Sequence, residues 1–205
     1  IMEGARIGKN CTIFPGAVIS GIPQDLKYNG EETTAEIGDN TTIRECVTIN
    51  RGTKDRTKTV IGKNCLIMAY SHIAHDCIVG NNVIMSNTSI LGGHAMIEEF
   101  AVLGGNTLVH QHVRVGKLSM TAGGTRIVKD VIPYMLVGRD PVKHYCLNKV
   151  GIKRYGVSDE DYKVLDKAFR LLRKGKDITK LSPQDRVREG ISFVPQTKNV
   201  FAGMT

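Results

Sequence analysis

The chain has 205 residues and a formal net charge of +8, with 41% hydrophobic and 5% aromatic residues and no Trp. This length suits one large domain, or a domain with an appendage, and allows a sizeable buried core. No apolar run is long enough to span a membrane, and no basic-then-apolar signal peptide begins the sequence. The five cysteines form no CxxC motif. We therefore expect a cytoplasmic protein with reduced thiols.

The positive charge is concentrated in the last third of the chain. Residues 138–205 hold 15 Lys and Arg against 8 Asp and Glu, a net of +7, whereas residues 1–137 hold 13 against 12. A basic segment favours an acidic partner. No nucleic-acid-binding motif or aromatic interleaving accompanies the charge, so nucleic acid is not the expected partner.

The stretch from Ile61 to Ile132 repeats every six residues without a slip. First positions are branched aliphatics in all hexads except those that begin at Met85 and Thr121, and every fifth position holds Val or a smaller residue. A helix would repeat at 3.6 residues and a half-buried strand at 2, so this period predicts a parallel β-helix of hexapeptide repeats. Three hexads complete one coil of a triangular prism, and coils stack at ~4.8 Å.

Glycine recurs at the second hexad position and asparagine at the fourth, as in Gly62 and Asn64. Both residues tolerate positive φ, so we expect outward corners at these positions, with first and fifth positions pointing inward. The same register holds from Ile1, which suggests that further coils precede this point in the native protein. It breaks at residues 21–34 and 51–59, which we interpret as loops thrown out from the coil.

The repeat fades after Pro133. Ser158 and the acidic residues that follow resemble a helix N-cap, and apolar residues at helical spacing predict an amphipathic helix over 158–174. The last stretch is expected either to hold a second short helix around 183–189 or to be extended. The sequence thus predicts a β-helix domain at 1–137 and a basic, mainly helical region at 138–205.

The three-hexad coil places His75 in line with Gly93 and Gln111, one and two coils later. The three residues should stack on one outward corner. Three more histidines lie beside that line: His72, His94 and His110. Histidine suits general-base work near neutral pH, a carboxylate at Asp76 can orient the imidazole, and a glycine N–H at 93 can approach a developing oxyanion.

Zinc is the main chemical rival at this corner, because clustered histidines are common metal ligands. It would require His75, His94 and His110 to converge. The sequence carries no GxSxG, catalytic Cys–His or phosphate-loop motif. We therefore favour direct attack assisted by a base, with no cofactor and no metal.

Several motifs resemble the UDP-N-acetylglucosamine 3-O-acyltransferases, which catalyse the first step of lipid A synthesis. They are Ser71–Cys77 (SHIAHDC), Leu91–His94 (LGGH), Val109–Gln111 (VHQ), Ile22–Glu31 (IPQDLKYNGE), Ile43–Thr53 (IRECVTINRGT) and Gly151–Arg154 (GIKR). The resemblance covers roughly residues 1–175. Members of the family carry coils before the point where this chain begins, and the tail at 178–205 looks divergent.

The resemblance implies a left-handed β-helix, a homotrimer with sites between subunits, and transfer of a 3-hydroxyacyl group from acyl carrier protein to the sugar 3-OH. His75 would be the general base, Asp76 would orient it, and the Gly93 N–H would bind the oxyanion. Gln24, Asp25 and Lys27 would bind substrate from the neighbouring subunit's side of the cleft. His72, His94, His110 and Gln111 would line the sugar and acyl site, Asn148 and Arg154 would hold the nucleotide, and Gly123 would leave room for a long acyl chain.

Two other classes of function stay open. One is a different hexapeptide-repeat enzyme, either a zinc-dependent carbonic anhydrase or a coenzyme A-dependent transferase. The other is a non-catalytic trimeric scaffold that binds ligand without turnover.

Overall fold

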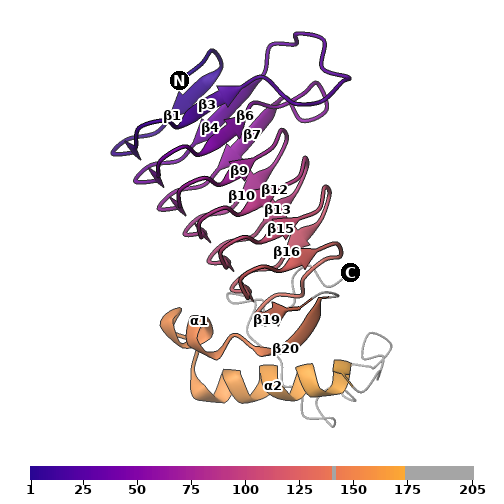
Figure 1. The fold of residues 1–205 in the computed structure, drawn as a ribbon. Coiled ribbons are helices and arrows are strands. Elements are labelled where there is room, and N and C mark those ends of the chain that lie inside the picture. The colour runs from indigo at the N-terminus through magenta and orange to yellow at the C-terminus, as the bar shows by residue number, and fades with distance from the viewer. Residues whose placement is uncertain (140–141, 174–205) are drawn as a thin grey trace. The chain divides into compact units, whose positions relative to one another are not determined.

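The computed structural model describes residues 1–139 and 142–173. The chain folds as a left-handed parallel β-helix, as predicted, whose coils stack one after another from the N-terminus (Figure 1). Three sheets of mainly parallel strands form its sides. Sheet A contains β1 (Ala5–Ile7), β4 (Thr34–Ile37), β7 (Lys58–Ile61), β10 (Ile78–Val79), β13 (Met96–Ile97) and β16 (Arg114–Val115).

The other two sheets complete the prism. Sheet B contains β2 (Thr12–Ile13), β5 (Thr42–Ile43), β8 (Leu66–Ile67), β11 (Ile84–Met85), β14 (Val102–Leu103), β17 (Met120–Thr121), β19 (Met135–Gly138) and β20 (Lys143–Leu147). Sheet C contains β3 (Val18–Gly21), β6 (Thr48–Asn50), β9 (His72–Ile73), β12 (Ile90–Leu91), β15 (Leu108–Val109) and β18 (Arg126–Ile127).

First and fifth hexad positions fill the narrow core, as predicted. Ile67, Ile73, Leu91 and Leu103 are fully buried first positions, and Cys77 is a fully buried fifth position. Each coil therefore buries a ring of aliphatic and small side chains, and burial of this apolar surface is the main source of stability.

Glycine at the second hexad position has a different role at the corners from the one expected. In the regular coils the fourth position has positive φ whichever residue occupies it, including Asn64, Tyr70 and Asp76. Second-position glycines such as Gly62 do not have positive φ. At Gly62 an added Cβ would lie 2.6 Å from the backbone of Gly80 in the next coil. The prediction for asparagine is thus confirmed, whereas glycine is needed for close approach between coils.

The two predicted loops are insertions into otherwise regular coils. Leu66 pairs with Ile84 at the regular spacing of three hexads. Thr12 instead pairs with Thr42, two hexads beyond that spacing, and Thr42 pairs with Leu66, one hexad beyond it. The insertions span 22–33 and 51–57, slightly less than predicted, because the flanking residues extend strands β3, β4 and β7.

The predicted hexapeptide repeat extends further along the chain than the regular coils of the structure do. Ile127 pairs with Val109 at the regular spacing, but Val131 bridges to Val115, two positions short of a full coil. Val131 therefore takes the place of a first position rather than a fifth. Strands β19 and β20 follow in a segment for which the sequence predicted no strands.

The chain divides into two compact units, the first running from Ile1 to Tyr145 and the second beginning at Cys146. The second unit holds α1 (Lys149–Arg154), which was not predicted, and α2 (Asp159–Arg173), which matches the predicted helix. Ser158 caps α2 by accepting a hydrogen bond from the Asp161 N–H, 3.0 Å away. No helix in the described ranges is long and apolar enough to cross a bilayer. The helix expected at 183–189 lies outside the described residues.

Adjacent glycines provide a test of the close approach between coils. A Cβ at Gly104 would lie 2.5 Å from the Thr121 carbonyl oxygen, whereas one at Gly105 meets only the Asn87 carbonyl oxygen at 3.5 Å. Gly104→Ala should lower the free energy of unfolding by about 1–3 kcal/mol, the usual cost of overpacking. Gly105→Ala is the matched control and should change it by less than about 0.5 kcal/mol. Denaturant unfolding measures both, and equal effects would contradict this account.

Candidate active site

The three residues predicted to stack on one outward corner all lie at the corner between sheets C and A. His75, Gly93 and Gln111 follow β9, β12 and β15 and precede β10, β13 and β16. Both inserted loops replace this same corner in earlier coils, because 22–33 joins β3 to β4 and 51–57 joins β6 to β7. One corner of the prism thus gathers both loops and the histidines.

His75 and Asp76 form a close hydrogen-bonded pair. His75 Nδ1 lies 2.8 Å from Asp76 Oδ2, and the two side chains are 14% and 0% exposed. A carboxylate at this distance favours the proton on Nδ1, which leaves Nε2 free to accept a proton from substrate. Burial opposes ionisation of Asp76, but hydrogen bonds from His75 and Thr53 outweigh it and lower the pKa of the carboxyl group.

Gly93 lies directly beneath the His75 ring. A Cβ at this position would lie 2.7 Å from His75 Nε2, so any other residue would displace the imidazole. Within the described part of the chain, the Gly93 N–H makes no hydrogen bond to another protein group. The position therefore offers a backbone donor beside the basic nitrogen, the arrangement needed at a developing oxyanion.

His94 connects this pair to a neighbouring ring and a loop. Its ring meets His75 edge-on at 5.3 Å and stacks on His112 at 4.6 Å. Its Nε2 lies 3.7 Å from Asp76 and its Nδ1 lies 3.5 Å from Asp55. Burial lowers the pKa of His94 although both carboxylates oppose the shift, so this ring is neutral at pH 7.

The other predicted side chains differ in how closely they approach the pair. His72 Nδ1 lies 2.7 Å from Thr48 Oγ1, and burial followed by the neighbouring His75 lowers the pKa of His72. His110 is exposed, with Nδ1 3.1 Å from the Gln111 carbonyl oxygen, and Gln111 is exposed as well. These two side chains are accessible to a ligand on the outside of the corner.

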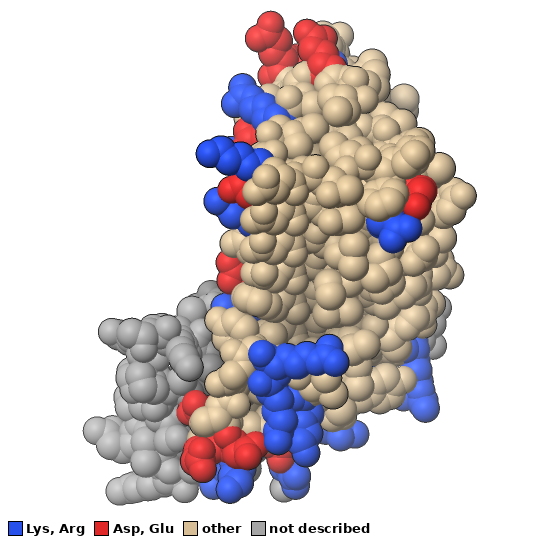
Figure 2. Space-filling model, turned by 90° about the vertical axis from the view of Figure 1, so that its left-hand side faces the viewer, with Lys and Arg blue, Asp and Glu red and all other residues tan. Residues whose placement is uncertain are grey.

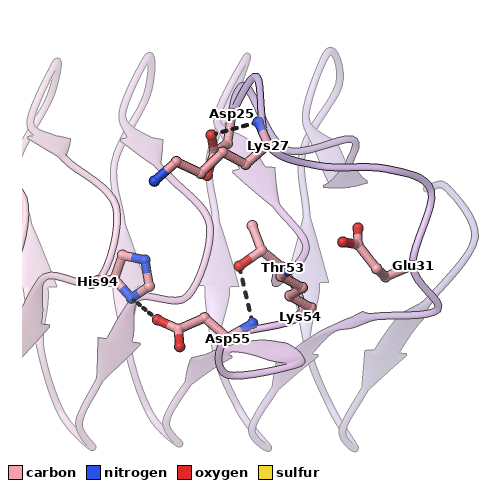
Figure 3. A pocket seen from close by; sticks show the side chains of 7 residues that line it. All are labelled: Asp25, Lys27, Glu31, Thr53, Lys54, Asp55 and His94. Carbon is pink, nitrogen blue, oxygen red and sulfur yellow. Dashed lines mark hydrogen bonds and ion pairs between the residues drawn. The ribbon is translucent and has the colours of Figure 1, made fainter.

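A pocket of about 510 Å³ opens beside His94 and joins the two loops (Figure 3). Asp25 and Lys27 line it from the longer loop of the same chain, and Lys27 extends toward the side where His94 lies. Gln24 is exposed and does not line it. Its complete lining is Asp25, Lys27, Glu31, Thr53, Lys54, Asp55 and His94.

Three other predicted residues belong to different segments of the chain. Gly123 follows β17 and precedes β18, which places it at the corner between sheets B and C. Asn148 and Arg154 belong to the second unit. The Asn148 side chain caps α1 by accepting a hydrogen bond from the Gly151 N–H at 3.1 Å, and Arg154 is exposed on the same helix.

Sequence reasoning missed Thr53, Asp55, Arg56 and His112. The signal for His112 was present, because it lies exactly one coil after His94. Thr53 was named only as the end of the Ile43–Thr53 motif, in a predicted loop to which no role was assigned, although that loop replaces the corner one coil before His75. The loop's internal contacts, described below, follow no period and could not be read from spacing.

Comparisons with known proteins identify the family of this chain. A family model described as "Bacterial transferase hexapeptide (six repeats)" matches residues 58–93, and one described as "Udp N-acetylglucosamine O-acyltransferase; Domain 2" matches residues 130–200. An acyl-[acyl-carrier-protein]–UDP-N-acetylglucosamine O-acyltransferase of Thermodesulfovibrio yellowstonii is 45% identical over 197 residues, which is 95% of this chain and 76% of the relative. This chain belongs to the UDP-N-acetylglucosamine O-acyltransferase family.

Other members of the family support the assignment. The Synechocystis protein of the same name is 46% identical over 84% of this chain, and this chain spans only 63% of its length. The crystal structure of a UDP-N-acetylglucosamine acyltransferase from Bacteroides fragilis superposes with a TM-score of 0.86 at 43% identity, covering 95% of this chain and 76% of that one. The family model reaches residue 200, so most of the tail that looked divergent lies within it.

A metal centre fits this corner poorly. His75, Asp76 and His94 each offer one ligand atom within 4.8 Å of the others, whereas His110 does not join them. The His75 and Asp76 atoms are only 2.8 Å apart, and the Asp76 oxygen also accepts the Thr53 hydroxyl at 2.7 Å. Zinc bonds of about 2.0–2.1 Å in a tetrahedron need ligand atoms roughly 3.3 Å apart. His75 and Asp76 are arranged as hydrogen-bonding partners, while His94 Nε2 lies 3.7 Å from Asp76 Oδ2.

A buried thiol beside the pair is no nucleophile. Burial raises the pKa of Cys77 to about 12, and its Sγ donates to the Gly92 carbonyl oxygen. The thiolate required for attack is therefore absent near neutral pH.

The lowered pKa of Asp76 predicts a pH-dependent contribution to stability. The ionised carboxylate is stabilised in the folded state, so its contribution is present above the unfolded-state pKa of about 3.9 and is lost as pH falls through the folded-state value. Asp76→Asn should reduce the free energy of unfolding by about 1–3 kcal/mol at pH 7. The difference from wild type should narrow below about pH 4. Urea titrations from pH 7 to 3 measure it, and a constant difference would contradict the expectation.

Proposed function

We propose that this protein transfers a 3-hydroxyacyl group from acyl carrier protein to the 3-hydroxyl of UDP-N-acetylglucosamine, the first step of lipid A synthesis, in the cytoplasm. The observation that carries the proposal is the His75–Asp76 pair set directly over Gly93. This pair combines a base, a group that orients the base, and a backbone donor in one accessible corner. The family supplies the substrate class, since its relatives are named for it.

The chemistry follows from the geometry at His75. Nε2 removes the proton of the sugar hydroxyl as the oxygen attacks the thioester carbonyl, and the Gly93 N–H stabilises the oxyanion that forms. Asp76 stabilises the imidazolium through Nδ1. When the intermediate collapses, the carbon–sulfur bond breaks and the imidazolium returns its proton to the departing thiolate. No covalent enzyme intermediate is required, in agreement with the inert Cys77 thiol.

The pocket beside His94 provides polar groups for the sugar. Asp25 can accept hydrogen bonds from hydroxyl groups, and Lys27 can donate to oxygen atoms or neutralise a phosphate. Asn148 and Arg154 are assigned to the nucleotide by resemblance to the family. The basic charge of residues 138–205 suits docking of an acidic carrier protein.

The first test is direct. Purified protein should acylate UDP-N-acetylglucosamine when supplied with 3-hydroxyacyl carrier proteins of several chain lengths. His75→Ala should reduce turnover by roughly 10²–10⁴-fold, the usual contribution of general-base catalysis. His144→Gln, at a histidine on β20 outside the corner, is the control. Near-wild-type turnover by His75→Ala would contradict the proposal. Stoichiometric zinc in active protein would favour the carbonic anhydrase alternative, and binding without turnover the scaffold.

We further propose that the active form is a homotrimer. Outward side chains on sheets B and C are almost all uncharged, and exposed apolar residues recur along them: Val18, Ile90, Leu108 and Met120. Figure 2 shows one broad face nearly free of Lys, Arg, Asp and Glu. Sheet A instead carries outward ion pairs such as Lys58–Glu36 and Arg114–Glu98. Exposed apolar faces of this kind favour contact between subunits.

The positions of His75 and Gly123 agree with that assembly. They lie on different corners of one prism, and an assembly in which one subunit's corner faces another's would let a single acyl chain meet both. Leu108→Glu should convert the trimer to monomer in light scattering, because a charge would be buried in the interface. Glu36→Gln on sheet A is the control and should leave the mass unchanged. A wild-type protein that is monomeric at micromolar concentration would refute this proposal.

A further inference from the structure

The shorter inserted loop, residues 51–57, holds the Asp76 carboxylate. Asp76 Oδ1 accepts hydrogen bonds from the Thr53 N–H at 3.0 Å and the Arg56 N–H at 3.3 Å. Asp76 Oδ2 accepts the Thr53 hydroxyl at 2.7 Å and faces His75 Nδ1. Among the described residues, the carboxylate's hydrogen-bonding partners other than His75 all come from this loop. His94 Nε2 lies further away, 3.7 Å from Oδ2.

Thr53 is placed to donate with a fixed direction. Its Oγ1 accepts a hydrogen bond from the Asp55 N–H at 3.3 Å, which directs the hydroxyl proton toward Asp76 (Figure 3 shows the Thr53–Asp55 contact). Thr53 is only 7% exposed and Asp76 is fully buried, so water cannot replace the bond without rearrangement. Hydrogen bonds to a buried charged group are among the strong ones.

The loop is closed on itself and anchored at the same place. Thr57 N–H donates to the Thr53 carbonyl oxygen at 2.7 Å, and a Cβ at Gly52 would lie 2.2 Å from the Lys58 nitrogen. The Arg56 guanidinium donates to the Asp76 carbonyl oxygen at 3.1 Å. The backbone at residue 76 is thus fixed from outside its own coil, and Thr53 cannot drift away from the carboxylate.

We infer that Thr53 is a positioning residue for the reaction proposed above, because it holds the Asp76 carboxylate ionised and aimed at His75 Nδ1. This inference rests on the proposed function for its catalytic consequence. Thr53 does not touch the reacting atoms. It acts through Asp76, which sets the tautomer and orientation of the His75 ring.

A purely structural role would predict a different outcome from a positioning role. A structural anchor would affect folding and leave the charge state of Asp76 unchanged. A positioning donor stabilises the ionised carboxylate, so its removal should raise the pKa of Asp76. The titratable and charged groups that face Asp76 are His75, His94 on the next coil, and Arg56 on the loop, while the Cys77 thiol beside it is neutral. None of them is altered by a substitution at Thr53.

The test uses Thr53→Val, which keeps the shape and removes the hydroxyl, and Thr53→Ser, which restores it. Thr57→Val is the matched control, since Thr57 lies in the same loop and its hydroxyl donates to the Arg56 carbonyl oxygen instead. In Thr53→Val, kcat should fall about tenfold or more, with KM changed less than about twofold. The acid limb of the pH–rate profile should move to higher pH. Thr53→Ser and Thr57→Val should resemble wild type.

A second readout needs no substrate. Carbon-13 NMR of the Asp76 carboxyl group should give a higher titration midpoint in Thr53→Val than in wild type. If Thr53→Val does not fold, Thr53→Ala takes its place in both measurements. An unchanged Asp76 midpoint together with an unchanged kcat overturns the inference. If wild type transfers no acyl group, the proposed function fails, while the NMR titration still decides whether Thr53 controls Asp76.

Discussion

The close stacking of successive coils is the constraint on which the rest of this structure depends. In the regular coils each strand pairs with its counterpart three hexads later, so every corner position lies against the same position in the next coil. Backbone groups approach so closely at second positions that only glycine fits at Gly62 and Gly104. The ladder leaves little freedom for side chains at the corner to shift, because the backbone beneath them is fixed on both sides.

That rigidity explains how an exposed corner can support a buried carboxylate. The fourth position has positive φ, and Asp76 occupies it. Taken alone, a carboxylate without exposed surface would be costly. The inserted loop offsets this cost by supplying backbone and hydroxyl donors, while His75 occupies the remaining side. The inserted loop is therefore part of the site. The regular β-helix supports both the loop and the His75–Asp76 pair.

How far the sequence predicts this molecule depends on whether a feature follows the repeat. The inward positions and the alignment of His75 with Gly93 and Gln111 follow from period alone. Helix α2 follows from its cap and its apolar spacing. Helix α1 was missed because it is short and contains Gly151, and because its N-cap, Asn148, was interpreted as a nucleotide contact by resemblance. The shortened last coil was missed because Val131 fits the hexad pattern in either register.

The contacts of Thr53 show more clearly which features cannot be predicted from the sequence. The break in the repeat predicts a loop at 51–59, but spacing cannot indicate which of several polar residues turns inward. That choice depends on the hydrogen bond from the Thr57 N–H to the Thr53 carbonyl oxygen and on the close approach of Gly52 to Lys58. Neither contact can be read from the spacing of residues in the sequence. Polar loops of this kind look like surface in sequence because their donors are satisfied only in the fold. In a β-helix, a break in the repeat at the corner of a candidate base is thus as informative as the repeat itself.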